Sequence, residues 1–150
     1  MNTKASIDSF LSQEHIALAG YSRDTKKFGH VVYKTLKEKG YTIYPVNPAG
    51  GRAPGGETIY TAIEALPAEV KALLVFTKPE VTAGLVEKAI AKGFEHIWIQ
   101  QMSGSKQLYE ALAQQDVNAV CGSCILLHAQ PTGIHKFHRW LLGLVGKLPR

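Results

Sequence analysis

A glycine followed by polar and basic residues ends the first short apolar run of the sequence. Gly20 closes that run, and Ser22, Arg23, Lys26 and Lys27 follow before a helical pattern begins. In an α/β protein, a strand, a glycine-bearing turn and a helix in that order bring free backbone N–H groups and the positive end of a helix to one place. Three cationic side chains add to this potential. We therefore expect a phosphate site at this turn, the alternative being a structural turn with solvated lysines.

A second group of residues that could take part in chemistry lies near the end of the chain. Cys121 and Cys124 form a Cys-x-x-Cys pair, which could be a redox pair or half of a zinc site completed by two of His128, His135 and His138. The pair follows the last predicted strand, whereas a thioredoxin-like pair precedes an early helix. We therefore expect the cysteines to be small buried side chains, the histidines to lie on a solvated or interface surface, and no metal to be bound.

Motifs of common hydrolases are missing from the sequence. It contains no Gly-x-Ser-x-Gly, no His-Glu-x-x-His and no pair of carboxylates beside a histidine. We therefore predict a binding protein with no catalytic residues.

Short apolar and β-branched runs predict the strands that must position the basic turn. The runs cover residues 16–19, 41–46, 71–76, 96–100 and 117–120, and the third is apolar almost throughout, as in a strand buried on both faces. Pro45 is expected to mark the end of hydrogen-bonded pairing in the second run.

Helical patterns alternate with these runs. The first is expected to begin at Ser6 or Asp8 and to end near Gln13, lying across an edge of the sheet. Longer helices are predicted for residues 28–39, 77–92, 105–115 and 133–146, and Ser103 or Ser105 is expected to cap the one at 105–115. A capping box that begins at Thr61 predicts an additional short helix. Residues 49–57 form a glycine-rich loop that we expect to be mobile.

This alternation predicts the fold class. Strands joined by helices at short spacing require right-handed crossovers, a parallel sheet and helices on both faces. We therefore predict a Rossmann-like, doubly wound α/β domain of about five strands. Ligands of such folds lie across the carboxyl ends of the strands, so the loops that follow residues 20, 46, 76 and 100 should share one crevice.

Length and charge limit the possible partners. The chain of 150 residues fits a single domain, residues 1–150, and its net charge of +5 favours anionic ligands. No apolar run is long enough to span a bilayer and the N-terminus lacks the pattern of a signal peptide, so we expect a cytoplasmic protein. No nucleic-acid-binding motif is present. The basic, aromatic pattern at 133–146 could pack on the sheet, on a second copy in a homodimer, or on a partner protein.

The known dinucleotide fingerprint does not fit the turn. It requires Gly-x-Gly-x-x-Gly and an acidic residue at the end of the second strand, whereas this strand ends in Val46, Asn47 and Pro48. A Walker loop is also missing. Cations without an acidic residue to bind the ribose hydroxyls suit a ligand that has a diphosphate and a phosphorylated ribose. An NADP-dependent enzyme or sensor that uses the same crevice is one such possibility.

Four segments resemble, in order and spacing, those of the small stand-alone CoA-binding proteins. They are Ala19-Gly-Tyr-Ser-Arg23, Tyr44-Pro-Val-Asn-Pro48, Phe76-Thr-Lys-Pro79 and Trp98-Ile-Gln100. This family is similar to the CoA-binding domain at the start of the succinyl-CoA synthetase α-subunit. In that subunit the phosphorylated histidine belongs to a following domain.

The resemblance implies a non-catalytic site for CoA or an acyl-CoA. Gly20, Ser22 and Arg23 would contact phosphate, as would Lys27 of the basic turn. The nucleotide would lie between the second loop (Val46, Asn47, Pro48) and the third (Phe76, Thr77, Lys78, Pro79), and Gln100 would lie near the pantetheine. Many family members have arginine after the third-strand Phe, where this chain has Thr77 and Lys78; lysine can pair with phosphate but not through a bidentate fork.

Overall fold

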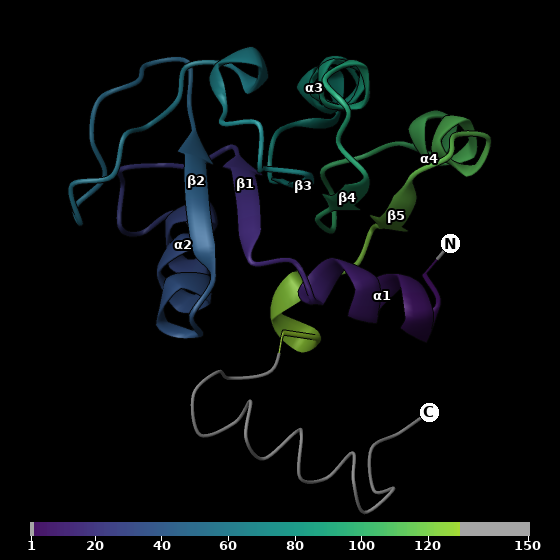
Figure 1. Cartoon of the computed structure of the whole chain (residues 1–150), viewed down its shortest axis with the longest axis horizontal. Helices are drawn as coiled ribbons and strands as arrows, with labels where there is room; N and C mark the ends of the chain where they lie inside the picture. The colour runs from purple at the N-terminus through teal and green to yellow at the C-terminus, as the bar shows by residue number, and fades with distance from the viewer. Residues whose placement is uncertain (1, 130–150) are drawn as a thin grey trace, which may run out of the picture.

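A single parallel sheet forms the centre of the computed structural model, which describes residues 2–129 (Figure 1). Its strands are β1 (His15–Ala19), β2 (Thr42–Val46), β3 (Ala72–Val75), β4 (His96–Ile99) and β5 (Asn118–Cys121). They are all parallel and lie in the order β2-β1-β3-β4-β5. The predicted five-stranded parallel sheet is confirmed.

Helices cover both faces of this sheet (Figure 1). The helices α1 (Lys4–Leu11) and α2 (Phe28–Glu38) lie on one face, and α3 (Pro79–Ala91) and α4 (Lys106–Ala113) lie on the other. Successive residues of β1 point to opposite faces, so that Ile16 and Leu18 pack under α1 and α2 while Ala17 and Ala19 join the other core. This arrangement confirms the Rossmann-like fold class.

The first helix begins earlier than the sequence predicted. Its N-cap is Thr3, whose side chain accepts a hydrogen bond from Ser6 N at 3.0 Å, so the expected cap at Ser6 or Asp8 is wrong. The hydroxyl of Ser6 donates back to the Thr3 carbonyl oxygen at 2.8 Å, which occupies the side chain expected to cap. The helix lies across the edge strand β5, where Asn118 Nδ2 donates to the Ser6 carbonyl oxygen at 2.9 Å.

The helix expected to begin at Thr61 is reduced to a short 3-10 turn, η1 (Ile63–Ala65), without a side-chain cap. Pro67 leaves too few residues for an α-helical turn with its own hydrogen bonds. A second 3-10 turn, η2 (Ile125–Leu127), follows β5. The capping residue Ser105 is confirmed, since its Oγ accepts from Leu108 N at 3.2 Å.

Pro45 lies inside β2 and does not end it. Because β2 is an edge strand, the missing N–H of proline faces away from β1, and the Pro45 carbonyl oxygen accepts from Tyr60 N at 2.8 Å on that outer side.

The predicted terminal helix at 133–146, together with His135 and His138, lies outside the described residues. None of the helices described within residues 2–129 has the length and apolar character that spanning a bilayer requires.

Candidate functional site: the carboxyl ends of the strands

The ends of β1 and β3 lie side by side where the strand order reverses. The chain passes from β1 to β2 on one side and continues from β3 on the other. Phe76 N donates to the Ala19 carbonyl oxygen at 2.8 Å, so the residues after these two strands are in contact. In open α/β sheets this switch point is the usual place of a ligand.

Two glycines allow three segments to meet there. Gly20 has a φ of +90°, and a Cβ on it would lie 2.9 Å from the Phe76 carbonyl carbon. A Cβ on Gly29 would lie 2.7 Å from the Gly20 carbonyl oxygen. The first turn of α2 therefore packs directly on the backbone at the end of β1, which a side chain at either position would prevent.

The turn between β1 and α2 is held by its own polar groups. Asp24 N donates to Ser22 Oγ at 3.1 Å, and Lys26 N donates to Asp24 Oδ1 at 3.0 Å. His30 Nδ1 donates to the Ser22 carbonyl oxygen at 3.1 Å, because a carbonyl oxygen can only accept. The turn thus has a defined shape before any ligand binds.

Lysines occupy the N-cap positions of both helices that start at this edge. Lys27 precedes α2 and Lys78 precedes α3, and neither helix has a side-chain cap. The N–H groups of the first turn are therefore not satisfied by a capping side chain, and a cation at a helix N-terminus opposes the helix dipole. A bound anion would offset both costs.

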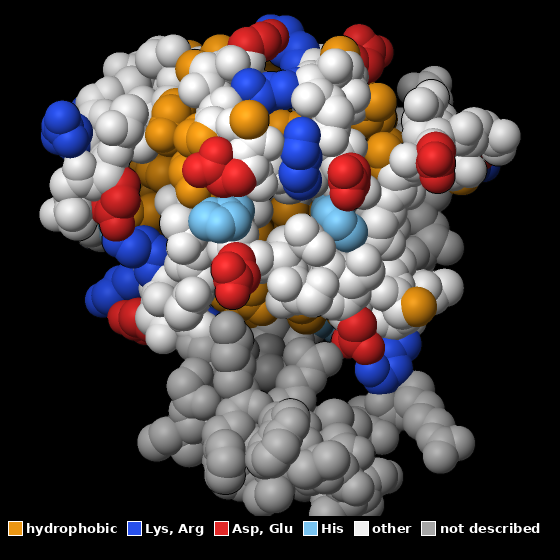
Figure 2. Space-filling model, in the orientation of Figure 1, with side chains coloured by type: hydrophobic (Ala, Val, Ile, Leu, Met, Phe, Trp, Pro, Cys, Tyr) orange, Lys and Arg blue, Asp and Glu red, His pale blue; other side chains and the backbone are white. Residues whose placement is uncertain are grey.

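Three cations near the switch point are not neutralised by a carboxylate in the described part of the chain. Among residues 2–129, Arg23, Lys27 and Lys78 form no ion pair with a carboxylate and are exposed. Ion pairs are formed instead by Lys4, Lys37, Lys88 and Lys106. Basic and acidic side chains are intermixed on the face seen in Figure 2. The unpaired cations near the switch point are therefore the ones available to an anionic ligand.

The loop after β2 is tied to the loop after β1 by Asn47. Its Nδ2 donates to the Tyr21 carbonyl oxygen at 2.8 Å, and its Oδ1 accepts from Ala49 N at 2.8 Å. The Asn47 amide is thus engaged within the protein. Val46 is buried in the core, Asn47 is partly exposed and Pro48 is exposed, so Pro48 presents the most side-chain surface of these three.

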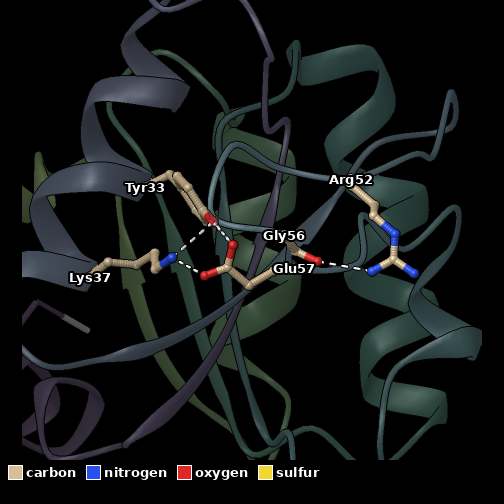
Figure 3. A network of polar contacts seen from close by, with 5 residues as sticks. All are labelled: Tyr33, Lys37, Arg52, Gly56 and Glu57. Atoms are coloured by element: carbon tan, nitrogen blue, oxygen red, sulfur yellow. Dashed lines mark hydrogen bonds and ion pairs between the residues drawn. The ribbon is translucent and has the colours of Figure 1, made fainter.

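The glycine-rich loop is anchored to α2 through Glu57, as Figure 3 shows. Tyr33 Oη donates to Glu57 Oε2 at 2.9 Å, and Lys37 forms an ion pair with the other carboxylate oxygen. At the far side of the loop, Arg52 donates to the Gly56 carbonyl oxygen at 3.0 Å. The loop expected to be mobile therefore has defined contacts.

The third loop combines aromatic and polar groups. Phe76 is half-buried and contacts the exposed ring of Phe28 edge-on, with ring centroids 5.7 Å apart. Thr77 Oγ1 lies 2.8 Å from the buried Thr82 hydroxyl, so it is occupied within the protein. Lys78 and Pro79 are exposed at the start of α3.

Gln100 follows β4 and continues the same edge. Its N–H donates to the Val75 carbonyl oxygen at 3.0 Å, which places it beside Phe76. Its Oε1 accepts from Ile125 N at 3.1 Å, and the side chain is buried. The four predicted loops are thus adjacent, in the order Asn47, Gly20, Phe76 and Gln100.

The Cys-x-x-Cys pair is divided between two environments. Cys121 is buried at the end of β5, and burial raises the pKa of its thiol to about 11, while Cys124 is partly exposed. His128 Nε2 lies 2.9 Å from Ser123 Oγ. Within residues 2–129, no group of three or more His, Cys, Asp or Glu side chains could hold a metal ion.

Tyr21 has the one fully buried side-chain polar atom without a hydrogen-bond partner among residues 2–129. Burial raises the pKa of its phenol, an effect that Arg23 partly opposes. Its ring packs edge-on against Tyr33 at 4.8 Å between centroids, so the side chain supports the turn from within the core.

A shallow hollow of about 250 Å³ lies away from this site, between α1, α4 and the start of β5, and no titratable side chain lines it.

Comparison with known proteins identifies the family. The family of CoA binding domains matches residues 14–130. This chain belongs to that family. The chain is 26% identical over 124 residues to the uncharacterized protein YneT of Bacillus subtilis, covering 82% of this chain and 91% of that protein.

A second relative is the α-subunit of an ADP-forming acetate–CoA ligase II from Pyrococcus furiosus. It is 29% identical over 130 residues, covering 79% of this chain and 28% of the subunit. A hypothetical protein of Pyrococcus horikoshii has a solved structure that is 28% identical, with a TM-score of 0.76, covering 84% of this CoA-binding domain and 89% of that chain. These relatives agree with the resemblance to small CoA-binding proteins and to CoA ligase subunits.

Sequence reasoning did not single out Gly29, Glu57 or Tyr33 as parts of the site. A glycine in the first turn of a predicted helix was a signal for a close approach at Gly29. Glu57 and Tyr33 are 24 residues apart and meet only through the path of the loop, for which the sequence carries no local pattern.

Proposed function

We propose that this chain binds CoA, free or acylated, without catalysing a reaction on it, as a single domain spanning residues 1–150. The observation that carries the proposal is the junction of Gly20, Gly29 and Phe76 with unpaired cations around it. A closely packed backbone with free N–H groups and positive side chains favours a diphosphate. Membership of the CoA-binding domain family supports CoA as the molecule to which this diphosphate belongs.

The remaining loops give each part of the ligand a place. In the proposal, the diphosphate lies at Gly20, Ser22, Arg23 and Lys27. The nucleotide lies between the second loop (Val46, Asn47, Pro48) and the third (Phe76, Thr77, Lys78, Pro79), and pantetheine passes Gln100. Since Val46 is buried and Asn47 and Thr77 are engaged within the protein, their contribution would be to shape the crevice. The expected cytoplasmic location stays a prediction.

Calorimetric titration with CoA and with NADP tests the proposal. We expect CoA to bind and the double variant Arg23→Ala/Lys27→Ala to bind it at least tenfold more weakly, which corresponds to about 1.4 kcal/mol. The matched control is Lys4→Ala/Lys88→Ala, which removes the same charge from two lysines in surface ion pairs and should leave CoA affinity unchanged. Tighter binding of NADP than of CoA would contradict the proposal. Equal CoA affinity of the double variant and the wild type would show that the diphosphate is misplaced.

A further inference from the structure

The turn after β4 contains a residue with two unfavourable features. Met102 has a φ of +69°, the one positive φ of a non-glycine residue among residues 2–129, and its side chain is 87% exposed. Ser103 N donates to the Gln100 carbonyl oxygen at 3.0 Å, so Met102 is the third residue of a tight turn, where glycine or asparagine is favoured. Backbone strain together with an exposed apolar side chain indicates that this position is kept for contact with another molecule.

Two buried polar groups flank Met102. Gln100 is 4% exposed and Ser103 is 5% exposed. The Gln100 side-chain oxygen accepts a hydrogen bond from Ile125 N, so the amide nitrogen of Gln100 points away from Ile125 N. No hydrogen bond within residues 2–129 involves this amide nitrogen or the Ser103 hydroxyl. Neither atom is fully buried, because Tyr21 Oη is the one such atom without a partner within residues 2–129, so both donors reach the surface of the turn and are available to an acceptor such as a carbonyl oxygen.

The position of this turn relates it to the CoA crevice. Gln100 lies beside Phe76, and Phe76 lies beside Gly20, so the turn is two strand spacings, roughly 10 Å, from the proposed diphosphate site. Apolar side chains are also exposed in the first turns of the two helices that begin at this edge, namely Phe28 of α2 at 48% and Val81 of α3 at 52%. Exposed apolar surface therefore lies close to the N-cap lysines of both helices.

We propose that the turn from Gln100 to Ser103 binds the thioester end of an acyl-CoA, with the Gln100 amide and the Ser103 hydroxyl donating to the thioester carbonyl oxygen and Met102 covering an apolar acyl chain. This inference rests on the proposed CoA-binding function and narrows its ligand from CoA in general to acylated CoA. Free CoA lacks both the thioester carbonyl and the acyl chain.

Three ligands separate the contributions: CoA, butyryl-CoA, and S-butyl-CoA, a thioether without the carbonyl. Calorimetry of the wild type should rank butyryl-CoA tightest, S-butyl-CoA next and CoA weakest. Ser103→Ala should weaken butyryl-CoA about fivefold and leave the other two ligands unchanged. Met102→Asn keeps a residue that tolerates the positive φ, and it should lower affinity for both butylated ligands by at least about fourfold, the value of one buried methylene.

Two controls keep the test decisive. Leu127→Asn removes another exposed apolar side chain, 77% exposed, outside the turn, and it should change none of the affinities. Thermal melting should show Met102→Asn to be at least as stable as the wild type, so a loss of acyl preference cannot come from unfolding. Equal wild-type affinity for CoA and butyryl-CoA, or an unchanged preference in Met102→Asn, would overturn the inference while leaving CoA binding intact. Failure of all three ligands to bind would overturn the proposed function itself.

Discussion

The ion pair between Lys37 and Glu57 offers a quantitative test of how the glycine-rich loop is held (Figure 3). Both side chains are 33% exposed, and Tyr33 Oη also donates to Glu57 at 2.9 Å. The change Glu57→Gln removes the charge but keeps an amide oxygen that can accept one hydrogen bond. A partly exposed pair contributes up to about 1 kcal/mol, and a hydrogen bond to a charged acceptor contributes more than one to a neutral acceptor. We therefore expect Glu57→Gln to lower the free energy of unfolding by about 1 kcal/mol, or roughly 3 °C in Tm.

A second ion pair in the same protein is the matched control. Lys88 Nζ lies 3.7 Å from Glu64 Oε1, with side chains 58% and 57% exposed, so Glu64→Gln should cost less than about 0.5 kcal/mol. Urea unfolding of the single and double variants gives the coupling energy of each pair, with Lys37→Met and Lys88→Met as the partner changes.

The loop also contacts the basic turn, which links its stability to binding. A Cβ on Gly51 would lie 3.1 Å from the Arg23 guanidinium, so the loop backbone lies directly under this cation. We therefore expect Glu57→Gln to weaken CoA binding while Glu64→Gln does not. A coupling energy for Lys37 and Glu57 no larger than that for Lys88 and Glu64 would refute the reasoning that burial and the Tyr33 hydrogen bond strengthen this pair.

Two further predictions concern the helix junction and the pH dependence of stability. Gly29→Ala should lower Tm and weaken CoA binding, because its Cβ would meet the Gly20 carbonyl oxygen at 2.7 Å, whereas Gly84→Ala in α3, with nothing within 4 Å of its Cβ, should do neither. Burial lowers the pKa of His96, and its neutral Nδ1 accepts from Asn118 Nδ2 at 3.3 Å, so the unfolded state binds more protons as pH falls below about 6.5. The wild type should therefore lose more Tm than His96→Gln between pH 8 and pH 5; equal losses would contradict this assignment.

Local patterns carried most of the fold. Alternation and apolar runs placed all five strands within about two residues of their observed bounds, because which face of a strand is buried is encoded in neighbouring residues. Errors arose where two local signals competed. At Thr61 the capping pattern lost to Pro67, and at Ser6 the hydroxyl bonds back to Thr3, which caps the helix in its place.

The site was predictable to the level of its loops. A parallel sheet requires the loops after its strands to share one edge, and the basic turn after Gly20 is visible as a run of residue types. The roles of individual side chains were harder to predict from the sequence. Asn47 and Thr77 were expected to line a ligand, but their polar atoms bond within the protein. The Tyr21 carbonyl oxygen that Asn47 Nδ2 contacts comes from the loop after β1, whereas Ala49 N and the Thr82 hydroxyl are local partners, close by in the sequence.

The sequence by itself therefore determined the parallel α/β architecture, the basic turn after the first strand and membership of a CoA-binding family, since all three reside in short-range patterns of residue type. The tertiary structure alone decided that Gly29 meets Gly20, that Glu57 reaches Tyr33 and Lys37, and that Gln100 and Ser103 retain donors beside Met102. These contacts depend on strand order and on the paths of the loops, and steric and hydrogen-bonding demands settle them only once distant segments are packed together.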